Sequence, residues 1–99
     1  FLVTVFFNII FILFSIWRPK LFFDKGRYGQ AYALWQPLAN NGDLVAQNYI
    51  GIHYYLGLGI ERNLGLANKW FKRAALGGFS DAQYNHANNL AKKYLNIEK

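Results

Sequence analysis

Residues 42–83 read GDLVAQNYIGIHYYLGLGIERNLGLANKWFKRAALGGFSDAQ, and this stretch decides the fold. Its beginning and end are alike, because Gly42 recurs as Gly78 and Gln47 recurs as Gln83, each 36 residues later. The same offset pairs Trp35, which precedes the stretch, with the aromatic Phe71. A period between about 20 and 50 residues is typical of stacked repeat architectures. The sequence therefore predicts structural repeats.

The spacing of apolar residues predicts a helical hairpin in each repeat. Apolar side chains recur at roughly helical intervals between residues 44 and 56, where Asp43 is placed to cap the first amides and Gly57 to end the helix. Asn63 can cap a second helix that has its apolar residues on one face. Residues 30–40 show the same pattern around Pro37, and we expect one kinked helix there. The predicted fold is all-α, with an N-terminal transmembrane helix followed by a short α-solenoid of helical hairpins.

The pattern resembles the Sel-one-like repeat, a relative of the tetratricopeptide repeat, over roughly residues 26–91. Two features depart from it, because Ala87 stands where Gly51 does and no Gly-x-Gly follows Leu90. We therefore expect about two repeats and a closing helix over residues 82–94. The resemblance implies a helical solenoid that binds other proteins and performs no chemistry. The residues that carry it are Ala46, Gln47, Gly51, Tyr54, Gly57, Gly59, Asn63, Ala67, Trp70, Phe71, Ala74, Ala75 and Gly78.

The N-terminal stretch from Phe1 to Trp17 is almost continuously apolar and carries no charged side chain. As a helix it would be about 25 Å long, near the lower limit for crossing the hydrocarbon core of a bilayer. A cleaved signal peptide is disfavoured because no small-residue cleavage site precedes Arg18, and a chain this short cannot build the large core that an all-apolar buried helix requires. We predict a single membrane anchor, with its aromatic contacts to lipid made by Phe1, Phe6, Phe7, Phe11, Phe14 and Trp17.

The segment after the anchor is basic and contains Pro19, which is expected to end the span. The predicted domains are an anchor over 1–17, a basic juxtamembrane linker over 18–27, helical repeats over 28–95 and a tail over 96–99. Two roles are open for Phe22 and Phe23. Either they lie in the membrane interface, or they pack on the first repeat helix. The basic residues favour cytoplasmic repeats by the positive-inside rule, whereas exported relatives of the resembled family favour the other side.

The formal net charge of +6 suggests a basic edge on the molecule. Such an edge would meet nucleic-acid phosphates or anionic lipid, although a solvated helix face is the commonest explanation for surface lysines. We expect a lipid bilayer as a partner and disfavour nucleic acid. The candidate residues of the basic edge are Arg18, Lys20, Lys69, Lys72 and Arg73.

Catalytic chemistry finds little support in the chain. There is no cysteine, and His53 and His86 have no carboxylate neighbour in the sequence to complete a metal site. Asp43 and Asp81 fall at expected helix starts, where capping explains them. We therefore expect neither an enzyme nor a cofactor, metal or small-molecule substrate.

The remaining function is protein binding at a membrane. About 80 residues follow the anchor, a size at which a helical core is marginal, so a partner would supply part of the stability. We expect a small accessory or assembly subunit of a larger membrane complex, in a bacterial inner membrane. The alternative is a tethered binder of anionic lipid or nucleic acid. Aromatic side chains are common at interfaces, and the candidate partner-binding residues are Tyr49, Tyr54, Tyr55 and Tyr84.

Overall fold

The computed structural model describes residues 1–95, apart from the side chains of residues 15 and 16. Over this range the chain is all-helical, which confirms the predicted fold class in its coarse form. The expected tail, 96–99, lies outside the described residues. The helices are α1 (Leu2–Asp24), α2 (Tyr28–Asn40), α3 (Leu44–Leu56), α4 (Leu64–Leu76) and α5 (Ser80–Leu95).

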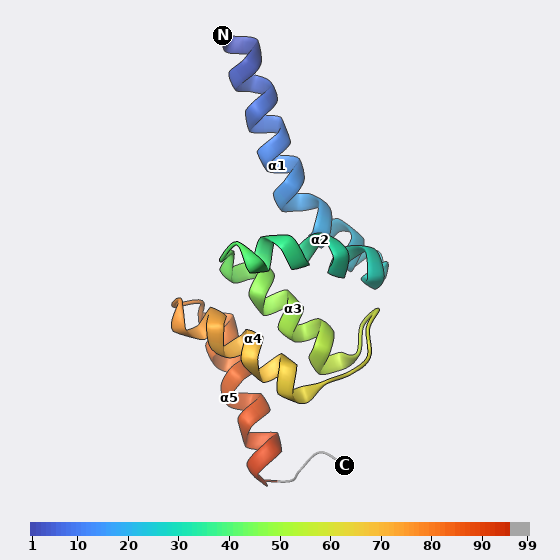
Figure 1. Cartoon of the computed structure of the whole chain (residues 1–99), viewed down its shortest axis with the longest axis vertical. Coiled ribbons are helices and arrows are strands. Elements are labelled where there is room, and N and C mark those ends of the chain that lie inside the picture. The colour runs from blue at the N-terminus through green and yellow to red at the C-terminus, as the bar shows by residue number, and fades with distance from the viewer. Residues whose placement is uncertain (96–99) are drawn as a thin grey trace.

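The helices pack in the order of the chain, each against the next. Figure 1 shows α2 to α5 stacked as successive layers, while the N-terminal part of α1 projects away from them. The molecule is accordingly elongated, with extents of 57 × 27 × 18 Å. Because neighbours in space are neighbours in sequence, local contacts hold the body together.

The backbone repeats itself at the 36-residue offset seen in the sequence. The helix that begins at Tyr28 has a counterpart beginning at Leu64, and the one that begins at Leu44 has a counterpart beginning at Ser80. The turns match as well, because Gly42 and Gly78 have φ angles of 97° and 96°. Each of these two glycines donates its N–H to the carbonyl three residues earlier, at 3.1 and 3.0 Å.

One side-chain hydrogen bond also recurs at this offset and ties each hairpin together. Gln47 Nε2 donates to the Ala39 carbonyl oxygen at 3.2 Å, and Gln83 Nε2 donates to the Ala75 carbonyl oxygen at 3.3 Å. Carbonyls near the end of a helix have no partner within the helix. The Ala39 and Ala75 carbonyl oxygens already accept the glycine N–H of the turn, and the glutamine of the following helix adds a second donor to each.

Polar side chains begin α3 and α4 as the sequence predicts. Asp43 Oδ1 accepts the Ala46 N–H at 2.8 Å, and Asn63 Oδ1 accepts the Leu66 N–H at 2.9 Å. The loop between these helices rises towards the start of α2 (Figure 1). There Gly59 has a φ of 71°, and a Cβ on it would lie 2.5 Å from the backbone nitrogen of Gly29. Only glycine permits this close approach.

The core lies between α2, α3 and α4. Trp35 and Ile50 are its large members on α2 and α3, packed with the small residues Ala31, Ala39 and Ala46. Phe71 fills the space between α3 and α4, where a Cβ on Gly51 would lie 2.5 Å from its ring. Small residues at these positions let neighbouring helices approach closely.

The expected end of the first helix at Pro19 is wrong, because α1 continues to Asp24. Pro19 is buried and sits inside the helix, with only residues 25–27 connecting α1 to α2. Two contacts explain why the helix persists: Phe22 and Phe23 pack against the core, and Lys20 Nζ lies 2.7 Å from Asp24 Oδ2 one turn on. The packing role of the two phenylalanines therefore holds, and the basic segment is mostly helix.

The N-terminal part of α1 makes little contact with the rest of the chain. Within the described residues it is the one helix long and apolar enough to cross a membrane, and only 6% of its apolar window is buried. A helix in the core of a soluble protein would be mostly buried, so this explanation does not fit. A signal sequence has a similar length and composition to a membrane-spanning helix, so both explanations fit α1.

Candidate interaction surface

Two adjoining cavities form a groove along one side of the helical body. The α1 cavity, about 540 Å³, lies between the end of α1 and the helices α2 and α3. The α5 cavity, about 490 Å³, lies between α3 and α5. Lys20 and Val45 line both cavities, so the two lie side by side. The apolar lining comes from Trp17, Leu21, Trp35, Leu38, Val45, Tyr49, Ile52, Phe79 and Tyr84.

An aromatic stack holds the middle of the groove. The rings of Trp35 and Tyr49 are parallel within 6°, with centroids 4.4 Å apart. Phe23 packs edge-on against the same tyrosine at 5.0 Å. Trp35 is almost fully buried, yet its indole N–H has no acceptor among the described residues. The repeat pattern marks the tryptophan as a core residue but gives no sign of this unpaired donor.

The groove is acidic although the chain is basic. Its charged lining consists of Lys20, Asp24, Asp43 and Asp81, which leaves an excess of negative charge. Lys20 and Asp24 form an ion pair, so the uncompensated negative charge is that of Asp43 and Asp81. Sequence reasoning explained Asp43 and Asp81 separately as residues at helix starts. It did not predict that the two aspartates line the same groove, because they lie far apart in the sequence.

The four predicted partner-binding tyrosines do not form one surface. Tyr49 and Tyr84 line the groove, and Tyr84 is 72% exposed. Tyr54 and Tyr55 lie at the C-terminal end of α3 and do not line it. Tyr54 and Tyr55 follow Tyr49 by five and six residues, and at about 100° per residue they point about 140° and 120° away from it, contrary to the expectation of one shared surface.

Tyr54 and Tyr55 are engaged inside the body. The hydroxyls of Tyr32 and Tyr54 lie 2.8 Å apart, and burial followed by this hydrogen bond raises the pKa of Tyr32 to about 12. Lys92 donates to the Tyr55 hydroxyl and its ammonium lies 4.8 Å from the ring centroid. Both tyrosines therefore connect helices within the chain.

His53 occupies an aromatic enclosure. It is fully buried, with the rings of Phe23 and Tyr32 at 5.4 and 5.6 Å. Its Nδ1 lies 2.7 Å from the Leu58 carbonyl oxygen, so Nδ1 donates and Nε2 is left unprotonated. Burial lowers the pKa of His53 despite this hydrogen bond. The imidazole is therefore a neutral packing group at ordinary pH.

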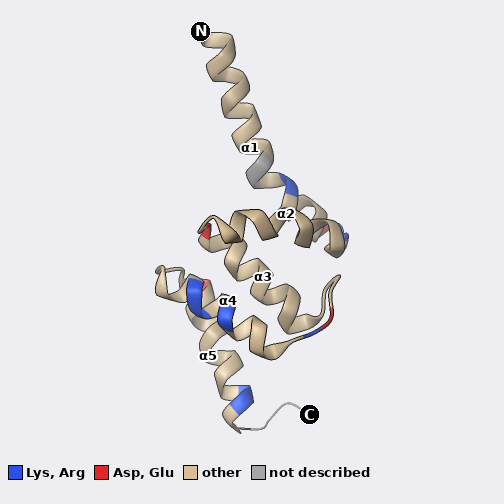
Figure 2. Cartoon of the chain, in the orientation of Figure 1, with Lys and Arg blue, Asp and Glu red and all other residues tan. Residues whose placement is uncertain are grey.

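The predicted basic edge falls into two separate places. On α1, the Arg18 guanidinium lies 5.4 and 5.7 Å from the rings of Phe14 and Phe22. On α4, Lys69, Lys72 and Arg73 are exposed and share a helical face, and the Arg73 guanidinium lies 4.7 Å from the ring of Trp70. Figure 2 shows the basic residues of α4 apart from those at the end of α1.

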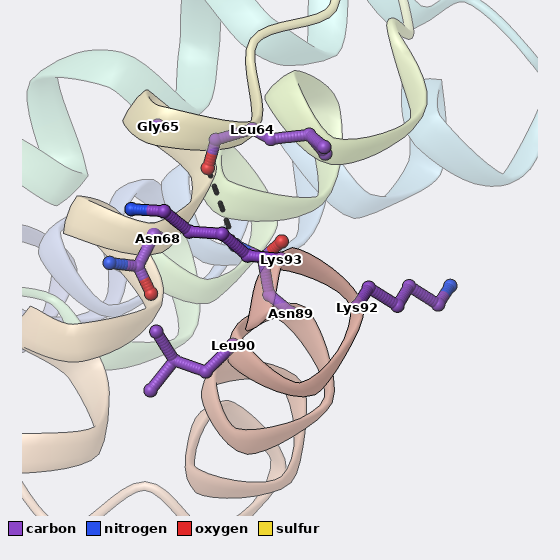
Figure 3. A pocket seen from close by; sticks show the side chains of 7 residues that line it. All are labelled: Leu64, Gly65, Asn68, Asn89, Leu90, Lys92 and Lys93. Atoms are coloured by element: carbon purple, nitrogen blue, oxygen red, sulfur yellow. Dashed lines mark hydrogen bonds between the residues drawn. The ribbon is translucent and has the colours of Figure 1, made fainter. Parts of the chain in front are cut away.

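A third, smaller cavity of about 240 Å³ lies between α4 and α5 and is basic (Figure 3). Asn89 Nδ2 donates to the Leu64 carbonyl oxygen at 3.3 Å across it. Lys93 extends beside Leu64 and Asn68, whereas Lys92 points away from them (Figure 3). Two lysines, Lys92 and Lys93, and no acidic residue line this cavity.

The predicted anchor residues are exposed along α1. Their exposed fractions range from 58% for Phe14 to 98% for Phe1. The other four lie between these values and are Phe6, Phe7, Phe11 and Trp17. Rings this exposed need a covering other than the described chain.

Comparison with known proteins gives one partial similarity. No protein-family model matches the chain, and no solved structure matches it. The chain is similar to the DAP3-binding cell death enhancer 1 of Rattus norvegicus, with 44% identity over 45 residues. That segment is 46% of this chain and 9% of the rat protein, too little to assign a family. The comparison with a rat protein also gives no support to the expected bacterial inner membrane.

Proposed function

We propose that the chain is a single-pass membrane protein whose helical body binds a partner protein in the groove. Its role would be that of an accessory or assembly subunit in a larger membrane complex, without enzymatic turnover. The observation that carries the proposal is the groove itself. An exposed apolar and aromatic surface of this extent, open beside an exposed apolar helix, fits a site that a partner covers.

We propose further that residues 28–95 are Sel-one-like repeats. The recurrence of Ala39, Gln47 and Gly42 at Ala75, Gln83 and Gly78 is accompanied by the same hydrogen bonds and the same φ angles. Chance similarity of composition would not reproduce this geometry. The rat protein with the similar segment is named for binding DAP3, which is in keeping with a protein-binding role but concerns that protein alone.

The membrane part of the proposal is supported by α1. The helix exposes large apolar side chains on all sides over its N-terminal part and has no charged residue before Arg18. Trp17 at the end of that stretch suits the headgroup region, where indole rings are favoured. The intact chain should therefore stay in membranes during alkaline carbonate extraction, and release by carbonate would contradict the anchor.

A second candidate function is a tethered binder of anionic lipid or nucleic acid. The exposed basic face of α4 and the lysines beside the small cavity favour it. Binding through phosphates weakens steeply with salt, whereas an apolar groove is far less sensitive. Salt dependence of partner retention therefore separates the two functions.

The groove can be tested with a matched pair of substitutions. Tyr84→Ala removes an exposed ring of α5 that lines the groove, and Tyr94→Ala removes an equally exposed ring of the same helix outside it. Proteins that co-purify with the chain in mild detergent should be lost from the first variant and retained by the second. Full retention by Tyr84→Ala, or a wild-type chain that purifies without any other protein, would overturn the proposal.

A further inference from the structure

We propose that the α1 cavity receives the basic end of a partner's membrane-spanning helix. This inference rests on the proposed function and names the chemistry of the partner. The occupant would lie along α1 within the bilayer. Its terminal turn, carrying Lys or Arg, would reach the groove where Asp24 and Asp43 line it.

The cavity is continuous with the exposed face of α1. Trp17, Leu21 and Asp24 line it, at positions spaced by four and three residues on one side of the helix. Ile10 and Leu13 precede Trp17 by seven and four residues and therefore lie on the same side, where both are exposed. A second helix packed against this side of α1 would end at the cavity.

The dimensions suit the end of a helix. A volume of about 540 Å³ lies within the range of about 300–1,000 Å³ that is usual for binding pockets. One helical turn, about 10 Å across and 5.4 Å long, has a volume of similar order. The side chains of one terminal turn would enter, and the rest of the helix would remain against α1.

The charge of the groove selects a basic occupant. Asp24 and Asp43 line the α1 cavity and Asp81 lines the adjoining α5 cavity. The single lysine there is paired with Asp24, so the uncompensated negative charge is that of Asp43 and Asp81. Helices that cross membranes are commonly flanked by Lys and Arg, which remain at the headgroups. Pairing these cations with the aspartates would place complementary charges beside a partly apolar wall, where screening by water is weakened.

The test measures whether a defined helix covers the cavity. Because the chain has no cysteine, Val45→Cys places a single thiol in the groove and Leu76→Cys places one on the exposed side of α4. Each full-length variant is reconstituted in phosphatidylcholine vesicles with a synthetic probe, a twenty-residue Leu-Ala span ending in Lys-Lys-Arg, about the length that crosses a bilayer. The matched probe ends in Gln-Gln-Gln. The rate of alkylation by an aqueous maleimide is recorded as the probe is titrated.

The basic probe should slow the reaction of Val45→Cys and leave that of Leu76→Cys unchanged. Adding Asp24→Asn or Asp43→Asn should raise the half-saturating probe concentration about three- to fivefold each, as expected for ion pairs near a surface. Asparagine keeps the capping ability of position 43, so the fold is retained. Glu61→Gln removes a carboxylate outside the groove and should change nothing.

Three results would overturn the inference. Equal protection by the two probes would show that charge does not select the occupant, and no protection by either would show that a helix end does not bind. A Val45→Cys thiol already unreactive without probe would assign the cavity to a lipid acyl chain. If one of these results appears while the chain resists carbonate extraction, only this inference fails and the proposed function stands. If carbonate releases the chain, the proposed function and this inference both fail.

Discussion

The hairpin α2–α3 and the hairpin α4–α5 share one backbone but not one environment. Both have the same glycine turn and the same glutamine hydrogen bond. The first lies between α1 and α4, whereas α5 packs only against α4 among its larger helix contacts. Gln47 is accordingly buried and Gln83 exposed. The comparison teaches that the repeat specifies local geometry, while the neighbours decide how much each residue contributes to stability.

The aromatic residues at the equivalent positions 35 and 71 should show the largest effect. Phe71→Ala and Trp35→Ala each delete a buried ring, which costs about 3–5 kcal/mol. Trp35→Ala should cost more, because it also removes the stack with Tyr49, a contribution of about 0.5–1.5 kcal/mol. Thermal unfolding of the full chain in detergent, followed by circular dichroism, measures both. If both variants lose the same free energy of unfolding, the stack of Trp35 on Tyr49 does not make the first hairpin more stable than the second.

The next contrast concerns Gly51 and its counterpart, Ala87. Gly51→Ala should destabilise the chain by about 1–3 kcal/mol, since the new methyl group would collide with the ring of Phe71. Gly65→Ala is the control, because the nearest atom to its Cβ is Asn63 Oδ1 at 3.4 Å. That variant should gain up to about 1 kcal/mol from helix propensity. A stabilised Gly51→Ala variant would mean that α3 and α4 are not this closely packed.

The recurring glutamines test burial directly. Gln47→Ala should cost about 0.5–1.5 kcal/mol, the usual net contribution of one hydrogen bond, because the buried Ala39 carbonyl loses this donor and keeps the Gly42 N–H. Gln83→Ala breaks the equivalent bond at an exposed position, where water replaces the donor, and should cost less than about 0.5 kcal/mol. Denaturant unfolding of the two variants gives the difference. Similar costs would contradict the unequal environments of the two hairpins.

Acid should weaken the first hairpin through His53. Its folded-state pKa lies below the usual value of about 6.5, so the unfolded chain takes up the proton first as the pH falls. Above about pH 6.5, His53 should therefore make no pH-dependent contribution to the free energy of unfolding. Below that pH, the free energy of unfolding should decline until the pH reaches the folded-state pKa of His53. His53→Asn, which copies Asn89 at the equivalent position, should flatten that decline. An unchanged slope would mean that other groups cause the acid sensitivity.

Sequence reasoning anticipated much of the fold because local rules govern helix ends. The bounds of α3, its cap at Asp43 and the cap of α4 at Asn63 follow from residues within one turn of each end. Pro19 was misleading for the same reason. The local preference of proline is to end a helix, and it was outweighed by the packing of Phe22 and Phe23, which lie further along the chain.

The candidate site was anticipated only in part. Tyr49 and Tyr84 were among the expected partner-binding residues and line the groove, while Tyr54 and Tyr55 do not. Which side of a helix becomes a groove depends on how the next helix crosses it. No pattern within one helix contains that information.

The chain's own pattern was enough to establish the helices, the 36-residue recurrence and the apolar N-terminal segment, since each depends on spacing along the chain or on composition. Packing alone decided that α1 runs unbroken into the body, that Trp35 stacks on Tyr49, and that three distant aspartates line one acidic groove in a basic protein. These features arise between residues far apart in sequence. Their free energies are set by burial and by the direction of neighbouring side chains, which exist only once the helices have assembled.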